Sequence, residues 1–299
     1  MYRKVYCILA HKNPSQVQEL ISLLDDKKSL FFIHLDKKVD QNEYEVAIEN
    51  LSCYFVKNRV SCTWGKYSLV QATLNAMKEV QSFMNVNFKN STYHFIMLSG
   101  EDLPLKQNSF IHDFLKSKVE TSFLNHWQLP YSKWWEGGLF RFENLFFFEY
   151  KKYSKLNYRI NRIIKKIHLK SLLPHNRFNK HFPDFKIYGA SQWMILTRDM
   201  VNFILEKNIE NKKFNSIFKY VLAPDELYFA TLILNFDVKK QFTVSNMKTH
   251  LVSFSGTEPS PKYLLVEDLK NDKEDLLFAR KFDSNMNQDS IDKVKTIIA

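Results

Sequence analysis

The segment Pro224-Asp225-Glu226 places two adjacent carboxyl groups directly behind a proline. A carboxylate in such a place could act as a general base that removes a proton from a hydroxyl group. Proline at the first helical position followed by acidic residues is also typical of an ordinary helix start, where the helix dipole stabilises carboxylates by about 0.3–1 kcal/mol. The two interpretations are compatible, because the same dipole favours the ionised form that a base requires.

Basic residues near the C-terminus could stabilise a leaving group. Lys248 lies in VSNMKTHLV, and Arg280-Lys281 lies in LLFARKFD. Fixed cations can neutralise the charge that grows on a phosphate as its bond to a sugar breaks, although lysines of this kind are also common on ordinary surfaces. The chain contains no Walker loop, G-x-G-x-x-G, G-x-S-x-G or H-E-x-x-H motif. The usual kinase, dehydrogenase, hydrolase and zinc-protease interpretations are therefore excluded.

The elements that must position these residues alternate between short apolar runs and amphipathic helices. Strands are expected at 5–11, 29–36, 53–56 and 93–102, and helices after Asn13-Pro14, over 67–84 and from near Thr197. This alternation predicts an α/β fold with a mostly parallel central sheet flanked by helices. Because ligands of such sheets bind beyond the carboxyl ends of the strands, the polar residues at those ends are candidates for a site: His11, Asp36 and the SGED segment that ends at Asp102.

Aromatic residues gather after residue 120, in NHWQLPYSKWWEGGLFRFENLFFF, which also holds the adjacent Gly137 and Gly138. We expect irregular, loop-carried structure there. The faces of Trp134 and Trp135 could bind sugar rings, but aromatic clusters also belong to cores, and both interpretations stay open. No repeat or Pro/Gly-rich linker divides the chain, so we expect a single domain of 299 residues.

The net charge of +11 indicates an anionic partner, and most of it lies in one segment. Residues 151–180 contain ten Lys or Arg and no Asp or Glu. Leu156, Ile160, Ile163, Ile164 and Ile167 recur there at helical spacing, which is typical both of a helix lying on anionic lipid and of a solvated helix with one face on the core. We find no apolar run long enough to span a membrane and no signal peptide, and therefore expect a cytoplasmic protein. Cys7, Cys53 and Cys62 lack zinc or disulfide spacing.

Seven motifs, read in order, resemble the core-2/I-branching β-1,6-N-acetylglucosaminyltransferase family, which includes peptide O-xylosyltransferases and bacterial members. The motifs are ILAHKNPSQVQELISLL, FFIHLDKK, WGKYSLVQATLNAM, FIMLSGEDLPLK, IYGASQWMILTRDMVNFIL, APDELYFATLIL and LFARKFD. The resemblance implies a GT-A-like fold, inversion at the anomeric carbon and catalysis without a metal or other cofactor. The last implication agrees with the lack of any Asp-x-Asp pair.

The same resemblance implies roles for individual residues. Glu226 corresponds to the general base, and Asp225 would support the turn or the acceptor. Lys281, with its neighbour Arg280, corresponds to the contact with the donor diphosphate. In the family an arginine makes a second contact with the diphosphate. Its counterpart here is Lys248, whose ammonium group is a point charge and cannot form the bidentate contact of a guanidinium.

Further roles concern the donor and the acceptor. Asp36 would face the uridine with His11 nearby, and Asp102 would lie near the donor sugar or the ribose. Trp134 and Trp135 are acceptor candidates. The expected partners are a UDP-sugar, with GlcNAc favoured by family frequency, and a saccharide acceptor. A lipid-linked acceptor in bacterial surface polysaccharide synthesis, with peripheral contact to the inner membrane, would fit the basic segment.

Two other classes of function are alternatives. The basic segment and the aromatic residues before it could belong to a nucleic-acid-binding protein, but no RNP motif or helix-turn-helix accompanies them, and we expect no nucleic-acid partner. A carbohydrate-binding protein that kept the fold without catalysis is the second alternative.

Overall fold

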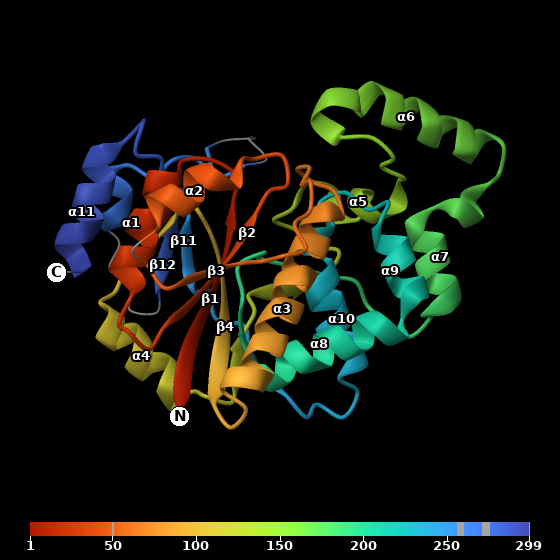
Figure 1. Ribbon diagram of the computed structural model, residues 1–299. Coiled ribbons are helices and arrows are strands. Elements are labelled where there is room, and N and C mark those ends of the chain that lie inside the picture. The colour runs from red at the N-terminus through yellow and green to blue at the C-terminus, as the bar shows by residue number, and fades with distance from the viewer. Residues whose placement is uncertain (50, 256–259, 271–275, 299) are drawn as a thin grey trace.

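The computed structural model describes residues 1–49, 51–255, 260–270 and 276–298 (Figure 1). Its centre is a seven-stranded sheet in the order β10 (Thr243–Ser245), β6 (Thr121–Phe123), β9 (Ile195–Thr197), β4 (Thr92–Ser99), β1 (Tyr2–Ala10), β2 (Leu30–Leu35) and β3 (Cys53–Phe55). β1 is parallel to β2 and β4, β2 to β3, and β6 to β10. β9 is antiparallel to β4 and β6. The predicted α/β fold with a mostly parallel sheet is confirmed.

Helices cover both faces of the sheet (Figure 1). One face carries α1 (Pro14–Leu24), α2 (Gln41–Ala47), α4 (Asn108–Ser117) and α11 (Gln288–Ile298). The other carries α3 (Ser68–Asn87), α8 (Arg198–Glu210), α9 (Lys212–Phe218) and α10 (Tyr228–Phe236). The strands at the centre are apolar without alternation because both of their faces are buried.

β1 shows how one strand serves two cores. Val5 and Cys7 pack with α3 and α8, whereas Tyr6 and Ile8 pack with α1 and α2. All four side chains are fully buried. Successive side chains of a strand point to opposite faces, so a continuous apolar run fills both layers at once.

Two smaller sheets connect distant parts of the chain. β12 (Phe278–Arg280) lies between β11 (His250–Val252) and β5 (Asp102–Pro104), and its antiparallel register with β5 places Arg280 opposite Asp102. β7 (His126–Gln128) pairs with β8 (Tyr188–Ala190), and a 3-10 helix, η4 (Val266–Lys270), precedes β12. Arg280 and the adjacent Lys281 are thereby brought close to the carboxyl end of β4.

The basic segment leaves the body of the molecule. After η1 (Trp135–Gly138) and α5 (Phe140–Glu143), the chain forms α6 (Tyr150–Lys166) and η2 (Lys170–Leu172), which we call the arm. Figure 1 shows α6 lying apart from the sheet. α7 (Pro174–His181) then returns to the core through the buried Phe178. The amphipathic helix expected over 151–180 is thus divided into three pieces.

None of the helices in the described part of the chain combines the length and hydrophobicity that a membrane span requires.

Candidate active site

The carboxyl ends of three adjacent parallel strands bring the first candidates together. The register pairs Ala10 with Leu35 and Leu9 with Ser99, so the residues that follow, His11, Asp36 and Gly100, lie at one edge. Backbone hydrogen bonds fix this arrangement: the N–H of Asp36 donates to Ala10 at 2.9 Å, and that of Gly100 to Leu9 at 3.0 Å. His11 is exposed at this edge.

Asp36 is buried and organises a neighbouring loop. Its carboxylate accepts hydrogen bonds from the backbone N–H groups of Lys38, at 2.9 Å, and Cys62, at 3.2 Å. The ammonium group of Lys38 lies 3.5 Å away. The same loop reaches the Pro224-Asp225-Glu226 segment, because the N–H of Ala223 donates to the carbonyl of Gly65 at 3.0 Å. Residues 61–66 therefore connect Asp36 to Asp225 and Glu226.

Asp102 is fully buried beneath Arg280. Its carboxylate accepts from the N–H of Ser99, at 2.7 Å, and from the Ser99 hydroxyl, at 2.9 Å. Arg280 Nε lies 3.5 Å from Asp102 Oδ1. Burial raises the pKa of Asp102 to about 6, although the charge of Arg280 opposes the rise. Asp102 thus faces the Arg280 side chain and not the surface.

Arg280 is itself nearly buried and is held on several sides. The carbon centre of its guanidinium lies 3.9 Å from the centre of the Trp193 ring, and Nη2 lies 3.9 Å from Glu101. Such stacking and pairing leave the planar cation little rotational freedom. Its neighbour Lys281 lies with Nζ 4.4 Å from the centre of the Tyr263 ring.

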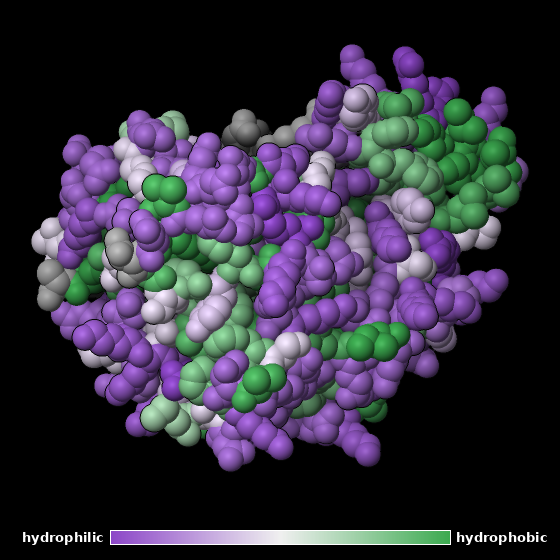
Figure 2. Space-filling model, in the orientation of Figure 1, coloured by the Kyte–Doolittle hydropathy of each residue, from purple (hydrophilic) through white to green (hydrophobic). Residues whose placement is uncertain are grey.

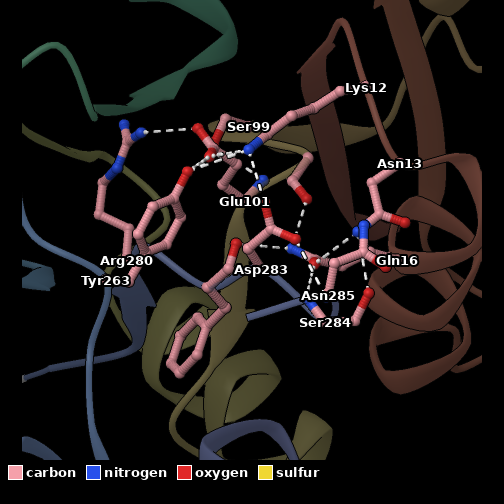
Figure 3. Close-up of polar contacts among 12 residues, drawn as sticks. Lys12, Asn13, Gln16, Ser99, Glu101, Tyr263, Arg280, Asp283, Ser284 and Asn285 are labelled. Atoms are coloured by element: carbon pink, nitrogen blue, oxygen red, sulfur yellow. Dashed lines mark hydrogen bonds and ion pairs between the residues drawn. The ribbon is translucent and has the colours of Figure 1, made fainter. Parts of the chain in front are cut away.

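Lys12 joins this group as a third cation (Figure 3). Its Nζ lies 2.9 Å from Glu101 and 2.8 Å from Asp283, and it donates to the Tyr263 hydroxyl at 3.1 Å. Burial would raise the pKa of Glu101, but the hydrogen bond and charge of Lys12 and the charges of Arg280 and Lys281 outweigh it and hold that pKa below its ordinary value. The cluster therefore combines three cations with ionised acids.

Lys248 is exposed and, like Arg280, lies near the buried His250. Both cations act on the buried His250, whose pKa is lowered to about 3 by burial, by Arg280 and by Lys248. The His250 ring also lies 6.0 Å from that of Trp193. Lys248 and Arg280 thus both lie close enough to the same imidazole to lower its pKa.

The Pro224-Asp225-Glu226 segment is a single 3-10 turn, η3 (Pro224–Glu226), and not the first turn of an α-helix. The expected helix begins later, at Tyr228, because Leu227 has the non-helical φ of −128°. Ala223 enters the turn in the left-handed conformation, with φ of 47°. The argument from the dipole of a helix starting at Pro224 therefore does not apply.

Glu226 is partly exposed and pairs with Arg141 through Oε2 and Nη1. The Arg141 guanidinium lies over the Trp134 ring at 4.1 Å from its centre, so Trp134 and Glu226 hold the same cation from two sides. The adjacent Asp225 is buried, and its Oδ1 has no hydrogen-bond partner among the described residues. Burial and the charge of Glu226 raise the pKa of Asp225 to about 7.

The two tryptophans predicted as acceptor residues have different surroundings. Trp134 packs edge-on against Trp127, with ring centres 5.0 Å apart. A Cβ at Gly189 would lie 2.5 Å from Trp127 Nε1 and 3.0 Å from the Trp134 ring, so a larger residue there would force these tryptophans to shift. Trp135 is 65% exposed and contacts Phe140. Trp134 therefore belongs to the group around Glu226, whereas Trp135 offers a free ring face.

Sequence reasoning missed several members of these two groups. Arg141 and Tyr263 carried no recognisable signal, because their partners are 85 and 251 residues away in the chain. Asp283 ends the LFARKFD motif, but the motif does not reveal its ion pair with Lys12, which is 271 residues away. Lys12 directly follows His11, and Glu101 lies inside the SGED segment already named as a candidate, but the sequence assigned neither residue a specific role. In the ranges that the structure describes, no three His, Cys, Asp or Glu residues are grouped so as to hold a metal ion.

Comparison with known proteins supplies the family. The sequence model of the Core-2/I-Branching enzyme family matches residues 5–273. The chain belongs to this family. Its fold, a mainly parallel sheet flanked by helices, is consistent with the GT-A-like fold. Arg280 and Lys281 lie just beyond the matched residues, so their assignment depends on the geometry described above.

Curated relatives in the core-2/I-branching family transfer sugars, as their names state. A xylosyltransferase of Ciona intestinalis is 23% identical over 97% of this chain and 33% of the relative. An N-acetyllactosaminide β-1,6-N-acetylglucosaminyl-transferase of Homo sapiens is 26% identical over 76% of this chain and 51% of the relative. A β-1,3-galactosyl-O-glycosyl-glycoprotein β-1,6-N-acetylglucosaminyltransferase of Bos taurus is 25% identical over 76% and 47%. The chain thus spans about a third to a half of these relatives.

Proposed function

We propose that this protein is an inverting glycosyltransferase that moves a sugar from a UDP-sugar to a saccharide hydroxyl group. The proposal depends most on one observation, the assembly of Arg280, Lys281 and Lys12 at the carboxyl edge of the sheet. Family membership and the names of the relatives support the reaction class. UDP-GlcNAc is the proposed donor, because the acetylglucosaminyl relatives are named for that sugar.

The cations would hold the leaving UDP in the proposed reaction. Arg280 is pre-positioned by Trp193 and by the buried Asp102, which therefore serves the donor through Arg280 and not by direct contact. As the bond between the anomeric carbon and the phosphate oxygen breaks, its electron pair passes to the diphosphate. Arg280 and Lys281 would stabilise that charge, with Lys248 beside them. We propose that these fixed cations replace a metal ion.

Glu226 would act as the general base. Its carboxylate takes the proton of the acceptor hydroxyl while the hydroxyl oxygen forms the new bond to the anomeric carbon, on the face opposite UDP. The ion pair with Arg141 fixes one carboxylate oxygen and leaves Oε1 without a hydrogen bond in the part of the chain described here. That free oxygen is the one proposed to accept the proton.

The remaining candidates would shape the two substrate sites. We propose that Asp36 and His11, side by side at the strand ends, face the uridine. Asp225 and Trp134 lie beside Glu226 and Arg141 and are proposed acceptor contacts, with Trp135 as an outer ring face. A lipid-linked saccharide of a surface polysaccharide is the proposed acceptor, supported by the exposed Phe147 and Phe148, which line a hollow with the loop that binds Ala223.

A donor panel tests the proposal. UDP-GlcNAc, UDP-xylose, UDP-glucose and UDP-glucuronic acid are each assayed for UDP release with and without EDTA, and with a mixture of saccharide acceptors. We expect release from UDP-GlcNAc that EDTA leaves unchanged. Loss of activity in EDTA that manganese restores would overturn the role given to the cations. Absence of both turnover and UDP binding would instead favour a carbohydrate-binding protein without catalysis.

A further inference from the structure

The arm exposes an apolar strip that its own helix does not bury. Leu156, Ile163 and Ile167 are 39%, 57% and 54% exposed. At about 3.6 residues per turn they share one face of α6. Leu169 and Leu172 of the following segment, 44% and 48% exposed, continue the strip. Figure 2 shows this hydrophobic area over the α6 region, with hydrophilic side chains along its upper edge.

A different face of α6 attaches the arm to the body. Asn157, Asn161 and Ile164 are buried, and Ile164 packs against Leu145. The two asparagines hydrogen-bond the backbone of the preceding segment, with Asn161 Oδ1 accepting from the N–H of Leu145 at 2.7 Å. The exposed strip is therefore not the core face of the helix, because the core face is already occupied.

A basic strip lies beside the apolar one. Arg159, Arg162 and Lys166 are exposed on the neighbouring face of α6, and none of them pairs with an acidic side chain within the described ranges. Residues 151–180 hold ten Lys or Arg and no Asp or Glu. The arm thus presents apolar and cationic side chains together, without acids to neutralise them.

We propose that α6 and η2 form a docking surface for an anionic phospholipid bilayer. The apolar strip would enter the headgroup boundary while the basic strip binds lipid phosphates and carboxylates. A nucleic acid would match the charge but leave the apolar strip without a partner. A second copy of this chain would bring two strongly basic arms together, which is electrostatically unfavourable. A lipid surface matches both strips at once.

The arm lies near the proposed acceptor side of the active site. This one relation rests on the proposed function. A hollow of about 570 Å³ lies between the base of the arm, at Phe147 and Phe148, and the loop that includes Thr63 and Lys66. That loop also binds Ala223 of the Pro224-Asp225-Glu226 turn. A docked arm would place lipid beside the approach to Glu226, where a lipid-linked saccharide must arrive.

Vesicle flotation tests the docking surface without any turnover. Vesicles of phosphatidylcholine alone are compared with vesicles containing phosphatidylglycerol at low and high salt. We expect binding to the anionic vesicles that weakens with salt. The triple variant Leu156→Ser, Ile163→Ser, Ile167→Ser should lower the partition coefficient at least about tenfold, since each side chain loses apolar burial in the bilayer.

A second triple variant tests the charge, Arg159→Gln, Arg162→Gln, Lys166→Gln. Each cation near an anionic surface is worth about fivefold in binding, so removal of three should weaken binding on the order of a hundredfold. The matched control is Val86→Ser, Ile209→Ser, Val238→Ser, which removes apolar side chains that are 82%, 64% and 80% exposed elsewhere. It should bind like the parent. All six arm side chains are exposed, and an unchanged melting temperature would verify folding.

Several outcomes would overturn the docking surface. One is equal vesicle binding by the parent and both arm variants. A second is binding of the parent to RNA or DNA, lost only in the charge variant, with no affinity for vesicles. A third is a dimer in sedimentation that the apolar variant converts to a monomer while vesicles bind neither form. Because none of these readouts needs catalysis, failure of the glycosyltransferase proposal would leave the result interpretable.

Discussion

Asp225 and Glu226 are adjacent in the chain but have opposite environments. Asp225 is buried with one oxygen unpartnered, whereas Glu226 is half-exposed and paired with Arg141. Neighbouring carboxyl groups whose surroundings differ in this way commonly divide acid, base and binding roles between them. The exposed, oriented carboxylate is the better base for a hydroxyl that arrives from solvent, and the buried one is better suited to positioning.

Replacing Glu226 by Gln tests the base. The amide keeps the size of the side chain but cannot accept the proton, so we expect turnover to fall about 10²–10⁴-fold while UDP binding changes little. Turnover is measured by UDP release and binding by calorimetry. Glu143→Gln, an exposed neighbour of Arg141, is the control and should retain the parent rate. A Glu226→Gln variant with near-parent turnover would remove Glu226 from the mechanism.

The raised pKa of Asp225 predicts a pH dependence of stability. Burial and the charge of Glu226 raise this pKa from 3.8 to about 7. Between about pH 4 and pH 7, Asp225 is therefore protonated in the folded chain but ionised in the unfolded chain. The contribution of Asp225 to the free energy of unfolding consequently falls as the pH rises through that range.

Asp225→Asn removes this titration. Relative to the parent, the variant should gain stability as the pH rises from about 4 to about 7, by up to about 4 kcal/mol. Urea unfolding followed by circular dichroism at several pH values measures the difference. Asp113→Asn, at an exposed position of α4, is the control. Parallel pH curves for Asp225→Asn and the parent would contradict the assigned burial effect.

β12 and α6 are held in the structure by different kinds of interaction. β12 is inserted between β11 and β5, and its hydrogen-bond register sets Arg280 opposite Asp102. α6 has no sheet to join and is attached by side-chain amides. Asn161 alone makes three hydrogen bonds, two with the backbone of Leu145 and one to the carbonyl of Asn157. Arg280 is therefore rigidly placed, whereas the arm depends on a few polar contacts and on the buried Ile164.

Asn161→Ala should release the arm locally. Loss of these contacts leaves the buried backbone groups of Leu145 without partners, at a cost of roughly 1–3 kcal/mol. Because the arm lies apart from the main core, we expect local opening with little change in the melting temperature. Trypsin cleavage within 151–166 should accelerate about tenfold. The control is Asn179→Ala, at an exposed position of α7, which trypsin should cleave at the parent rate. A parent-like cleavage rate for Asn161→Ala would contradict this attachment.

For the whole molecule, charge and chemistry are distributed unevenly. The carboxyl edge of the sheet gathers Lys12, Arg280 and Lys281 from opposite ends of the chain, and the arm carries most of the remaining positive excess. The cations of the edge are partly balanced by Glu101 and Asp283, whereas the arm contains no acid between 151 and 180. A compact diphosphate and an extended anionic surface would thus be bound by different parts of one protein.

Linkage between UDP and folding tests the cation cluster in the intact chain. A ligand that binds only the folded state at about 100 times its dissociation constant stabilises it by about 2.7 kcal/mol. We expect UDP to raise the melting temperature equally with EDTA and with manganese. Lys281→Ala should reduce that shift by weakening UDP binding roughly tenfold or more. Lys78→Ala, an exposed lysine of α3, should keep the full shift, and a shift that requires manganese would refute metal-free binding.

The sequence by itself determined the four parallel strands expected at 5–11, 29–36, 53–56 and 93–102 and the polar residues at their ends, because apolar periodicity is a local property. It also carried the family, through motifs that keep their order along the chain. It did not predict β6 and β10, nor the order of the strands in the sheet, which depends on packing between distant segments. It did not predict that the helix after Pro224 starts only at Tyr228, since a single left-handed residue, Ala223, and the non-helical Leu227 decide that boundary.

Only the tertiary structure decided which charges meet. Glu226 meets Arg141, Lys12 meets Asp283, and Arg280 lies over both Trp193 and Asp102. It also decided which side of α6 is covered, and hence that Ile164 is buried while Ile163 is exposed. Partners separated by tens to hundreds of residues leave no periodic trace in the chain, because their pairing depends on how whole elements pack and not on spacing along the sequence.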